Sequence, residues 1–259
     1  MIMNIAWVYP DIFNLHGDRG NMMALVKIAE AMGVEANIKK INYGDSIDFD
    51  NTDLVFMGAG QTRDLKHVIK DMKNYEEALK VYVENGGYIL SIGSTGCVLG
   101  KTLTLENEEK IEGFGLLDIA AKELNRTKMP YVTREVYGDD IWWTYKDMEI
   151  LGNQIQRVDY TLGDVKPLGQ IVYGYGNNLG GEEGARYKNI LLTNTVGPLL
   201  SSNPWFGADL IKEIMEAKGE KVSDSLEKLE FIEYAKEAME LKKKFIKDKF
   251  KLPGIIHNC

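Results

Sequence analysis

Short apolar segments alternate with longer amphipathic segments in the first hundred residues. Four segments have the β-branched, aliphatic or aromatic composition of strands, namely residues 3–8, 37–41, 54–57 and 88–92. Between them, residues 21–32 and 63–84 carry apolar side chains at helical spacing, and a glycine follows each stretch. Strands that alternate with helices in this way are typical of a parallel sheet with crossover helices. The pattern therefore predicts an α/β fold.

Past Gly113 the pattern changes to strands with fewer helices. Five strands are predicted there, over residues 131–137, 141–145, 148–151, 169–175 and 189–195. We expect these strands to extend or cap the first sheet in a mixed arrangement. A helix over residues 203–218 follows, with Pro204 in its first turn and Gly219 after its end.

The C-terminal segment 223–251 has the pattern of a long amphipathic helix. Its apolar positions are Leu226, Leu229, Phe231, Ile232, Ala235, Met239 and Phe245. We therefore divide the chain into a domain of residues 1–219 and a helical extension of residues 220–259. Apolar stripes of this kind usually pack on their own domain, and a docking helix for a partner is the alternative.

Composition and charge exclude several classes of protein. A chain of 259 residues buries a sizeable core without disulfides, and Cys97 and Cys259 allow one bridge at most. No C-x-x-C or H-x-x-x-H spacing occurs, so we expect no metal site and no cofactor. A net charge of −8 argues against nucleic acid as a partner. With no signal peptide and no apolar run near the roughly 20 residues of a membrane span, we expect a soluble, cytoplasmic protein.

Three loops contain residues suited to a binding site. Residues 14–21 are rich in turn formers directly before a helix, and Gly58-Ala59-Gly60-Gln61 lets backbone N–H groups approach a ligand closely. Residues 92–97 combine a strand end, a sharp turn and a helix start, which is the geometry of a nucleophile elbow. Ligands of open α/β sheets bind at the carboxyl ends of strands, so we expect the site there. Turns without a ligand are the alternative for the first two loops.

The elbow has no obvious nucleophile at its turn. Gly93 occupies that position, and the nearest candidates are Ser94 and Cys97. A serine needs a positioned general base. Cys97 lies about one helical turn further along, and we interpret it as a buried structural cysteine.

Six stretches carry a family resemblance in order along the chain: IAWVYPDIFNLHGDRGNMMAL, DLVFMGAGQ, GGYILSIGSTGCVLGK, IEGFGLLD, KPLGQIVYGYGNN and YKNILLTNTVGPLLSSNP. Together they resemble the class I, CobB/CobQ-type glutamine amidotransferases, and among these most closely the GatD subunits of lipid II isoglutaminyl synthase. The resemblance extends from Ile5 to the helix around Leu210. It implies a flavodoxin-like, three-layer α/β sandwich with a mostly parallel sheet.

The resemblance also implies a function. Proteins of this branch hydrolyse glutamine and supply ammonia to a MurT-like partner, an ATP-dependent subunit of the Mur-ligase type. That partner amidates the D-glutamate of lipid II in peptidoglycan synthesis. By resemblance, this chain has a MurT-like partner and a small amino-acid ligand.

Two positions depart from the family pattern. The family elbow reads I-C-G-G-Y/F-Q-x-L-G, and Gly93 stands where the nucleophilic cysteine belongs. The base histidine lies in an H-G-P-L/I-L motif, and Val196 stands in its place. Neither glycine nor valine attacks an amide or carries a proton. The remaining histidines, His16, His67 and His257, lie in the first loop, in a predicted helix and in the tail.

The ligand-binding positions match the family in part. Gly58-Ala59-Gly60 matches the oxyanion loop, and the N–H of Ser94 is expected to point into the pocket. Lys128 aligns nearest to the arginine that holds glutamine in the family, with Arg126 close by. Because lysine does not bind a carboxylate in the bidentate manner of arginine, this change weakens the case for glutamine as the ligand.

Three hypotheses follow from these residues. In the first, which the double replacement favours, the chain is a pseudo-amidotransferase that acts as a scaffold or regulator. In the second, it is an active amidotransferase whose nucleophile has moved to Ser94 or Cys97. In the third, it is a module that binds a small ligand.

Overall fold

The computed structural model describes residues 1–124, 139–223 and 226–249. The predicted strand 131–137 lies outside the described residues, as do Arg126, Lys128 and His257. The statements below concern the described residues.

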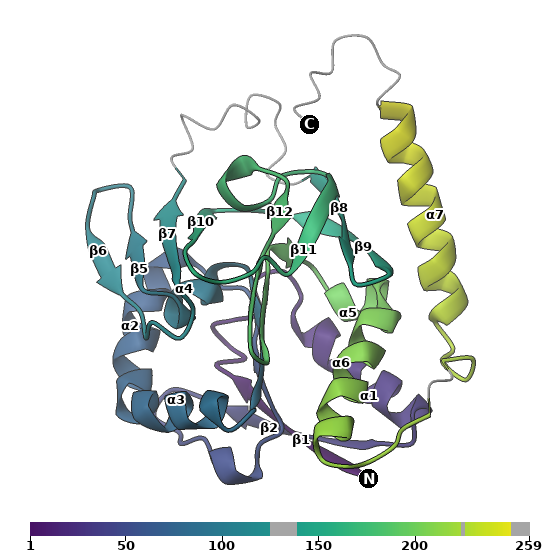
Figure 1. The fold of residues 1–259 in the computed structure, drawn as a ribbon, viewed down its shortest axis with the longest axis horizontal. Helices are drawn as coiled ribbons and strands as arrows, with labels where there is room; N and C mark the ends of the chain where they lie inside the picture. The colour runs from purple at the N-terminus through teal and green to yellow at the C-terminus, as the bar shows by residue number, and fades with distance from the viewer. Residues whose placement is uncertain (125–138, 224–225, 250–259) are drawn as a thin grey trace.

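A six-stranded sheet crosses the centre of the molecule (Figure 1). Its strands, in spatial order, are β13 (Ala185–Tyr187), β14 (Ile190–Thr193), β4 (Tyr88–Ile92), β3 (Leu54–Met57), β1 (Ile2–Val8) and β2 (Glu35–Ile41). Only the edge strand β13 is antiparallel to its neighbour within this sheet. The parallel strands therefore follow the 2-1-3-4-5 order of flavodoxin-like folds, which confirms the predicted class.

Helices cover both faces of this sheet (Figure 1). On one face lie α1 (Arg19–Ala31) and α6 (Pro204–Ala217), and on the other lie α2 (Thr62–Met72) and α3 (Glu76–Glu84). The uniformly apolar β3 shows why, because Leu54 and Phe56 pack into one core while Val55 and Met57 pack into the other. A strand buried on both faces has no polar side, and the expected three-layer sandwich is present.

Two smaller sheets follow in the chain. The first has the order β10 (Val158–Leu162), β7 (Ile119–Glu123), β5 (Thr102–Thr104) and β6 (Lys110–Glu112). The second has the order β12 (Glu182–Glu183), β11 (Gly169–Tyr173), β8 (Asp139–Tyr145), β9 (Met148–Gln154) and β15 (Thr195–Val196).

The later strands were expected to extend or cap the first sheet, and these separate sheets correct the first of the two alternatives. Of the later predicted strands that lie within the described residues, only 189–195 contributes to the first sheet, and that segment is divided between β14 and β15. Asn194 lies between these two strands. The chain therefore leaves the central sheet after β14, and Val196 pairs with β9 of the other sheet. The pattern missed β5, β6, β7 and β10, because three to five residues show too little periodicity.

The predicted helix 63–84 is also wrong as a single element. A 3₁₀ turn over Lys73–Tyr75 separates α2 from α3. The Tyr75 hydroxyl donates to the carbonyl of Asp45 at 3.1 Å and lies 3.4 Å from the Tyr9 hydroxyl. These contacts join the turn to the loops that follow β1 and β2, and helical periodicity alone does not reveal such contacts. The predicted helix 203–218 corresponds to α6, with Pro204 as its first residue, and the short α5 (Leu199–Ser202) precedes it.

The C-terminal helix α7 (Ile232–Lys249) begins later than predicted, since residues 226–231 form no continuous helix. Met239 and Ile246 on its inner face pack with Leu151 of β9, and Lys242 pairs with Asp140 at 3.3 Å. The helix thus packs on its own chain, and the domain boundary at 219/220 stays a prediction. Within the described residues, none of the helices combines the length and apolar character that crossing a bilayer requires.

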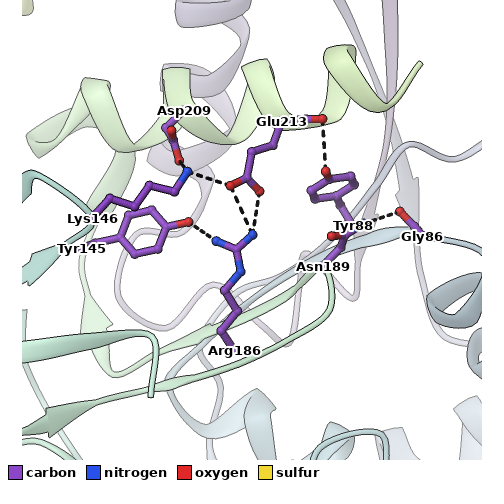
Figure 2. Close-up of polar contacts among 8 residues, drawn as sticks. All are labelled: Gly86, Tyr88, Tyr145, Lys146, Arg186, Asn189, Asp209 and Glu213. Carbon is purple, nitrogen blue, oxygen red and sulfur yellow. Dashed lines mark hydrogen bonds and ion pairs between the residues drawn. The ribbon is translucent and has the colours of Figure 1, made fainter. Parts of the chain in front are cut away.

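A network of ion pairs joins the second small sheet to α6 (Figure 2). Lys146, in the turn between β8 and β9, lies 2.7 Å from Asp209 and 2.8 Å from Glu213. Arg186 of β13 lies 2.9 Å from the same Glu213 and donates to the Tyr145 hydroxyl. Burial raises the pKa of Glu213, but its bonds to Lys146 and Arg186 outweigh burial and leave that pKa below its usual value. Glu213 is therefore the shared anion of the network.

Removal of this shared charge should destabilise the fold. In Glu213→Gln, Lys146 and Arg186 lose their common anion in a half-buried setting, and we expect the free energy of unfolding to fall by about 1–2 kcal/mol. The control is Glu84→Gln, which breaks the more exposed pair with Lys188 and should cost less than about 0.5 kcal/mol. Urea denaturation measures both, and equal losses would contradict the assignment.

Candidate functional site

A pocket of about 590 Å³ opens at the carboxyl ends of β1, β3 and β4. It lies at the point where the strand order reverses, between β1 and β3, which is where open α/β sheets bind ligands. Its lining residues are Leu15, His16, Ala59, Gly60, Gln61, Thr62, Arg63, Gly93, Ser94, Glu123, Ile155, Gln156, Arg157, Val158, Asn194 and Val196. The structure thus brings parts of the three predicted loops to one pocket.

Gly93 forms the elbow directly after β4, with a φ of +60°. This left-handed conformation favours glycine. A Cβ atom at this position would lie 3.4 Å from the Cβ of Ala59 and 3.6 Å from the Cγ1 of Val196, and both distances are ordinary contacts. A side chain at position 93 would therefore project toward position 196. The two positions that the family resemblance assigns to nucleophile and base face each other across the pocket.

The floor of the pocket between these positions is apolar. Val196 is buried and belongs to β15, which pairs with β9 and not with the central sheet. Ala59 is also buried and contributes a methyl group on the opposite side. At positions 59, 93 and 196 the pocket therefore has no side chain that could attack an amide or carry a proton.

Ser94 lies next to the elbow, but its hydroxyl is engaged. Its Oγ donates to the carbonyl of Gly60 at 2.6 Å and accepts from the N–H of Gly60 at 3.2 Å. The residue is 9% exposed. A serine becomes a nucleophile when a base takes its proton, and here that proton goes to a backbone carbonyl.

Cys97 lies in the short helix α4 (Gly96–Leu99) and does not line the pocket. Burial raises the pKa of its thiol to about 12, although the contact with the Tyr160 hydroxyl at 3.6 Å lowers it. Because the thiolate is the reactive form, this cysteine is inert at neutral pH.

Tyr160 of β10 holds the elbow through a hydrogen bond, and it is not among the residues predicted for the site. Its hydroxyl donates to the carbonyl of Gly93 at 2.7 Å. A Cβ atom at Gly96 would lie 2.7 Å from the same hydroxyl oxygen, so the glycine leaves the room that the tyrosine fills. No local motif signals this contact, since β10 lies more than 60 residues further along the chain.

Asp18 and Asn21 hold the loops around the pocket in place. The carboxylate of Asp18 accepts from the N–H of Ala59 at 3.1 Å and lies 3.4 Å from the side-chain amide of Asn21. Asn21 in turn accepts from the N–H of Leu200 at 2.9 Å. The first loop is thereby joined both to the Gly58–Gly60 loop and to the segment that follows Val196. Predicted loop 14–21 contains Asp18 and Asn21, but its turn-forming composition did not reveal these long-range bonds.

One wall of the pocket is charged. Glu123 accepts from the Thr62 hydroxyl at 2.6 Å and pairs with Arg157 at 3.4 Å.

Burial lowers the pKa of His16, which favours the neutral imidazole. His67 lies on α2 and does not line the pocket. In the described residues, no three or more His, Cys, Asp or Glu side chains gather in a way that would hold a metal ion.

The buried carboxyl of Asp18 predicts a pH dependence of stability. Burial raises its pKa to about 6 from 3.8, although hydrogen bonds from Ala59 and His16 oppose the shift. The folded state therefore binds the proton more tightly than the unfolded state, and this contribution is lost as pH rises through the folded pKa. Between pH 4 and pH 6.5, we expect the stability of the wild type relative to Asp18→Asn to fall by about 2–3 kcal/mol.

Urea denaturation at several pH values measures this difference. The control is Asp11→Asn, which removes an exposed carboxylate near the same loop. A relative stability of the wild type that stays constant or rises over this range would contradict the assignment.

Comparisons with known sequences match most of the chain. A sequence model of the CobB/CobQ-like glutamine amidotransferase domain matches residues 4–204. The GatD subunit of lipid II isoglutaminyl synthase (glutamine-hydrolyzing) from Streptococcus pneumoniae is 30% identical over 220 residues, covering 83% of this chain and 82% of the relative. The GatD subunit from Staphylococcus aureus is 31% identical over 219 residues, covering 84% and 86%.

A solved structure supports the fold assignment. The crystal structure of a glutamine amidotransferase matches with a TM-score of 0.56 at 18% identity, covering 83% of this chain and 98% of that protein. At this identity the match concerns the fold alone. The sequence matches extend over most of the chain and include the strands and loops that form the pocket. The chain therefore belongs to the CobB/CobQ-like glutamine amidotransferase family.

Proposed function

We propose that this chain is the amidotransferase-like subunit of an enzyme that amidates lipid II, and that it does not itself hydrolyse glutamine. The first part is supported by its similarity to two GatD subunits over more than four fifths of each protein. The second part is carried by one observation, which is that Gly93 and Val196 face each other at the apolar floor of the pocket.

Glutamine hydrolysis requires two groups at this floor. A thiolate attacks the side-chain amide carbon, the C–N bond breaks, and ammonia leaves after an imidazolium donates a proton to it. Water then hydrolyses the thioester to glutamate and restores the thiol. Gly93 offers no atom for the attack, and Val196 neither takes nor gives a proton.

The relocated-nucleophile hypothesis receives no support from the local geometry. The proton of Ser94 is bonded to the Gly60 carbonyl, and the thiol of Cys97 is buried with a pKa of about 12. Within the described residues, His16 is the histidine that lines the pocket. The Ser94 hydroxyl is hydrogen-bonded to Gly60 and not to this imidazole. We therefore favour the scaffold or regulatory role over an active glutaminase.

In this role the chain supports an ATP-dependent, MurT-like ligase that uses free ammonium or another amine. The features that support this role are the flavodoxin-like sheet, the Asp18 and Asn21 connections between loops, and the elbow itself. These features hold the surface around the pocket in place without a reacting side chain at position 93 or 196. A subunit that stabilises or positions its ligase needs that surface and not the thiolate.

A small-ligand role is the second candidate, because a pocket of about 590 Å³ is in the size range of ligand sites. A thermal-shift series with free amino acids and cell-wall precursors separates the two. Specific stabilisation by one compound favours the ligand role, whereas the scaffold role predicts none.

We predict no glutaminase activity. The purified protein, with and without its ligase partner, should release glutamate from glutamine at the rate of the buffer blank. Clear turnover above the blank would overturn the proposal. In that case Ser94→Ala and Cys97→Ala, tested separately, would identify the nucleophile.

The facing positions 93 and 196 also predict the behaviour of a repaired pair. In Gly93→Cys/Val196→His, the introduced imidazole should lower the pKa of the introduced thiol, as neighbouring histidines do in other proteins. We expect its alkylation by iodoacetamide at pH 7 to be at least about tenfold faster than in Gly93→Cys alone. Equal rates in the two variants would show that the positions are not in contact.

A further inference from the structure

The loop after β3 has no free backbone hydrogen-bonding group at its centre. The N–H of Ala59 donates to Asp18 at 3.1 Å, and the carbonyl of Ala59 accepts from the N–H of Leu15 at 3.0 Å. Both polar atoms of the Gly60 backbone are bonded to the Ser94 hydroxyl, at 3.2 Å for the nitrogen and 2.6 Å for the oxygen. Each backbone N–H and each carbonyl of Ala59 and Gly60 therefore has a hydrogen-bond partner within the protein.

This loop borders the place where a reacting group would stand. A Cβ atom at position 93 would lie 3.4 Å from the Cβ of Ala59, and Gly60 is the next residue. A Cβ atom at Gly60 would lie 2.5 Å from the Phe13 ring, so the backbone is packed closely at this point. Gly60 and Gly93 line the same pocket, and the N–H of Gly60 is a fixed donor there. A fixed backbone donor in such a pocket is what stabilises an oxyanion in acyl transfer.

We propose that Ser94 is a built-in occupant of this anion-binding position. Its Oγ accepts the Gly60 N–H and thereby excludes the oxygen of a ligand from that donor. The proposal rests on the proposed function and extends it, because it adds a third loss to those at Gly93 and Val196. The pocket lacks a nucleophile and a base, and one of its expected oxyanion donors, the N–H of Gly60, is also closed by a side chain of the same chain.

The neighbouring Thr95, and not Ser94, makes the hydrogen bonds that fix the turn from its buried side. Its hydroxyl lies 3.0 Å from the carbonyl of Ile92, 3.2 Å from that of Met57 and 2.9 Å from the Ser91 hydroxyl. Thr95 therefore fixes the turn to β3 and β4 from the buried side. Because the Thr95 contacts do not involve Ser94, removal of the Ser94 hydroxyl should open the donor without unfolding the elbow.

An NMR titration of the full chain tests the proposal. The probe is sodium formate, the smallest carboxylate, and the observable is the ¹H–¹⁵N signal of Gly60. Ser94→Ala is compared with the wild type and with Ser201→Ala, which also removes a hydroxyl bonded to a backbone carbonyl, that of Pro198 at 2.8 Å. Ser94→Gly provides a second variant that frees the same donor.

We expect a saturable shift of the Gly60 signal in Ser94→Ala and Ser94→Gly, and none in the wild type or in Ser201→Ala. An equal shift in the wild type, or no shift in either Ser94 variant, would overturn the proposal. Glutaminase activity of the wild type would overturn the proposed function instead, so the two failures are distinguishable.

A kinetic comparison gives a second readout. Addition of Ser94→Ala to Gly93→Cys/Val196→His should raise kcat for glutamine by about 10²-fold with little change in KM, which is the usual effect of one oxyanion donor. A kcat that is unchanged or lower in the triple variant would contradict the role of Ser94.

Discussion

The carboxylate of Asp18 is the contact on which the shape of the pocket depends. It is fully buried, accepts the N–H of Ala59, and is adjacent to Asn21, which holds the segment after Val196 through Leu200. Three loops from distant parts of the chain are positioned by these two side chains. A buried carboxylate is costly unless it is hydrogen-bonded, and here backbone N–H groups offset part of that cost. The floor at Gly93 and Val196 is a consequence of this arrangement.

The central sheet could be predicted because its strands are buried on both faces. Leu54–Met57 and Tyr88–Ile92 are continuous apolar runs, and the helices between strands have clear periodicity. Gly58-Ala59-Gly60 and Gly93 follow these strands directly, so the position of the pocket could also be predicted from the sequence. The second half of the chain is different, because several of its strands have only two to five residues and some, such as β10 with β7 and β15 with β9, pair with partners distant in the sequence.

The parts of the site that were missed all depend on long-range contacts. Tyr160 reaches Gly93 from another sheet, and the division of segment 189–195 into β14 and β15 is what brings Val196 to the elbow. The bond between Ser94 and Gly60 also joins residues on two different strand ends. Only the family resemblance linked Gly93 with Val196 before the fold was known, and the geometry places them in contact distance for a side chain at position 93.

The central proposal for this protein is that its fold is complete while the defining chemistry of its family is absent. The packed sandwich, the elbow with its positive φ and the loop connections are present, and positions 59, 93 and 196 in the pocket have only apolar side chains or none. The most direct test of this account follows the nitrogen in the reconstituted ligase complex. Lipid II is amidated in the presence of amide-¹⁵N glutamine and unlabelled ammonium, and mass spectrometry reads the label in the product. The account predicts unlabelled product, and ¹⁵N in the new amide would contradict it.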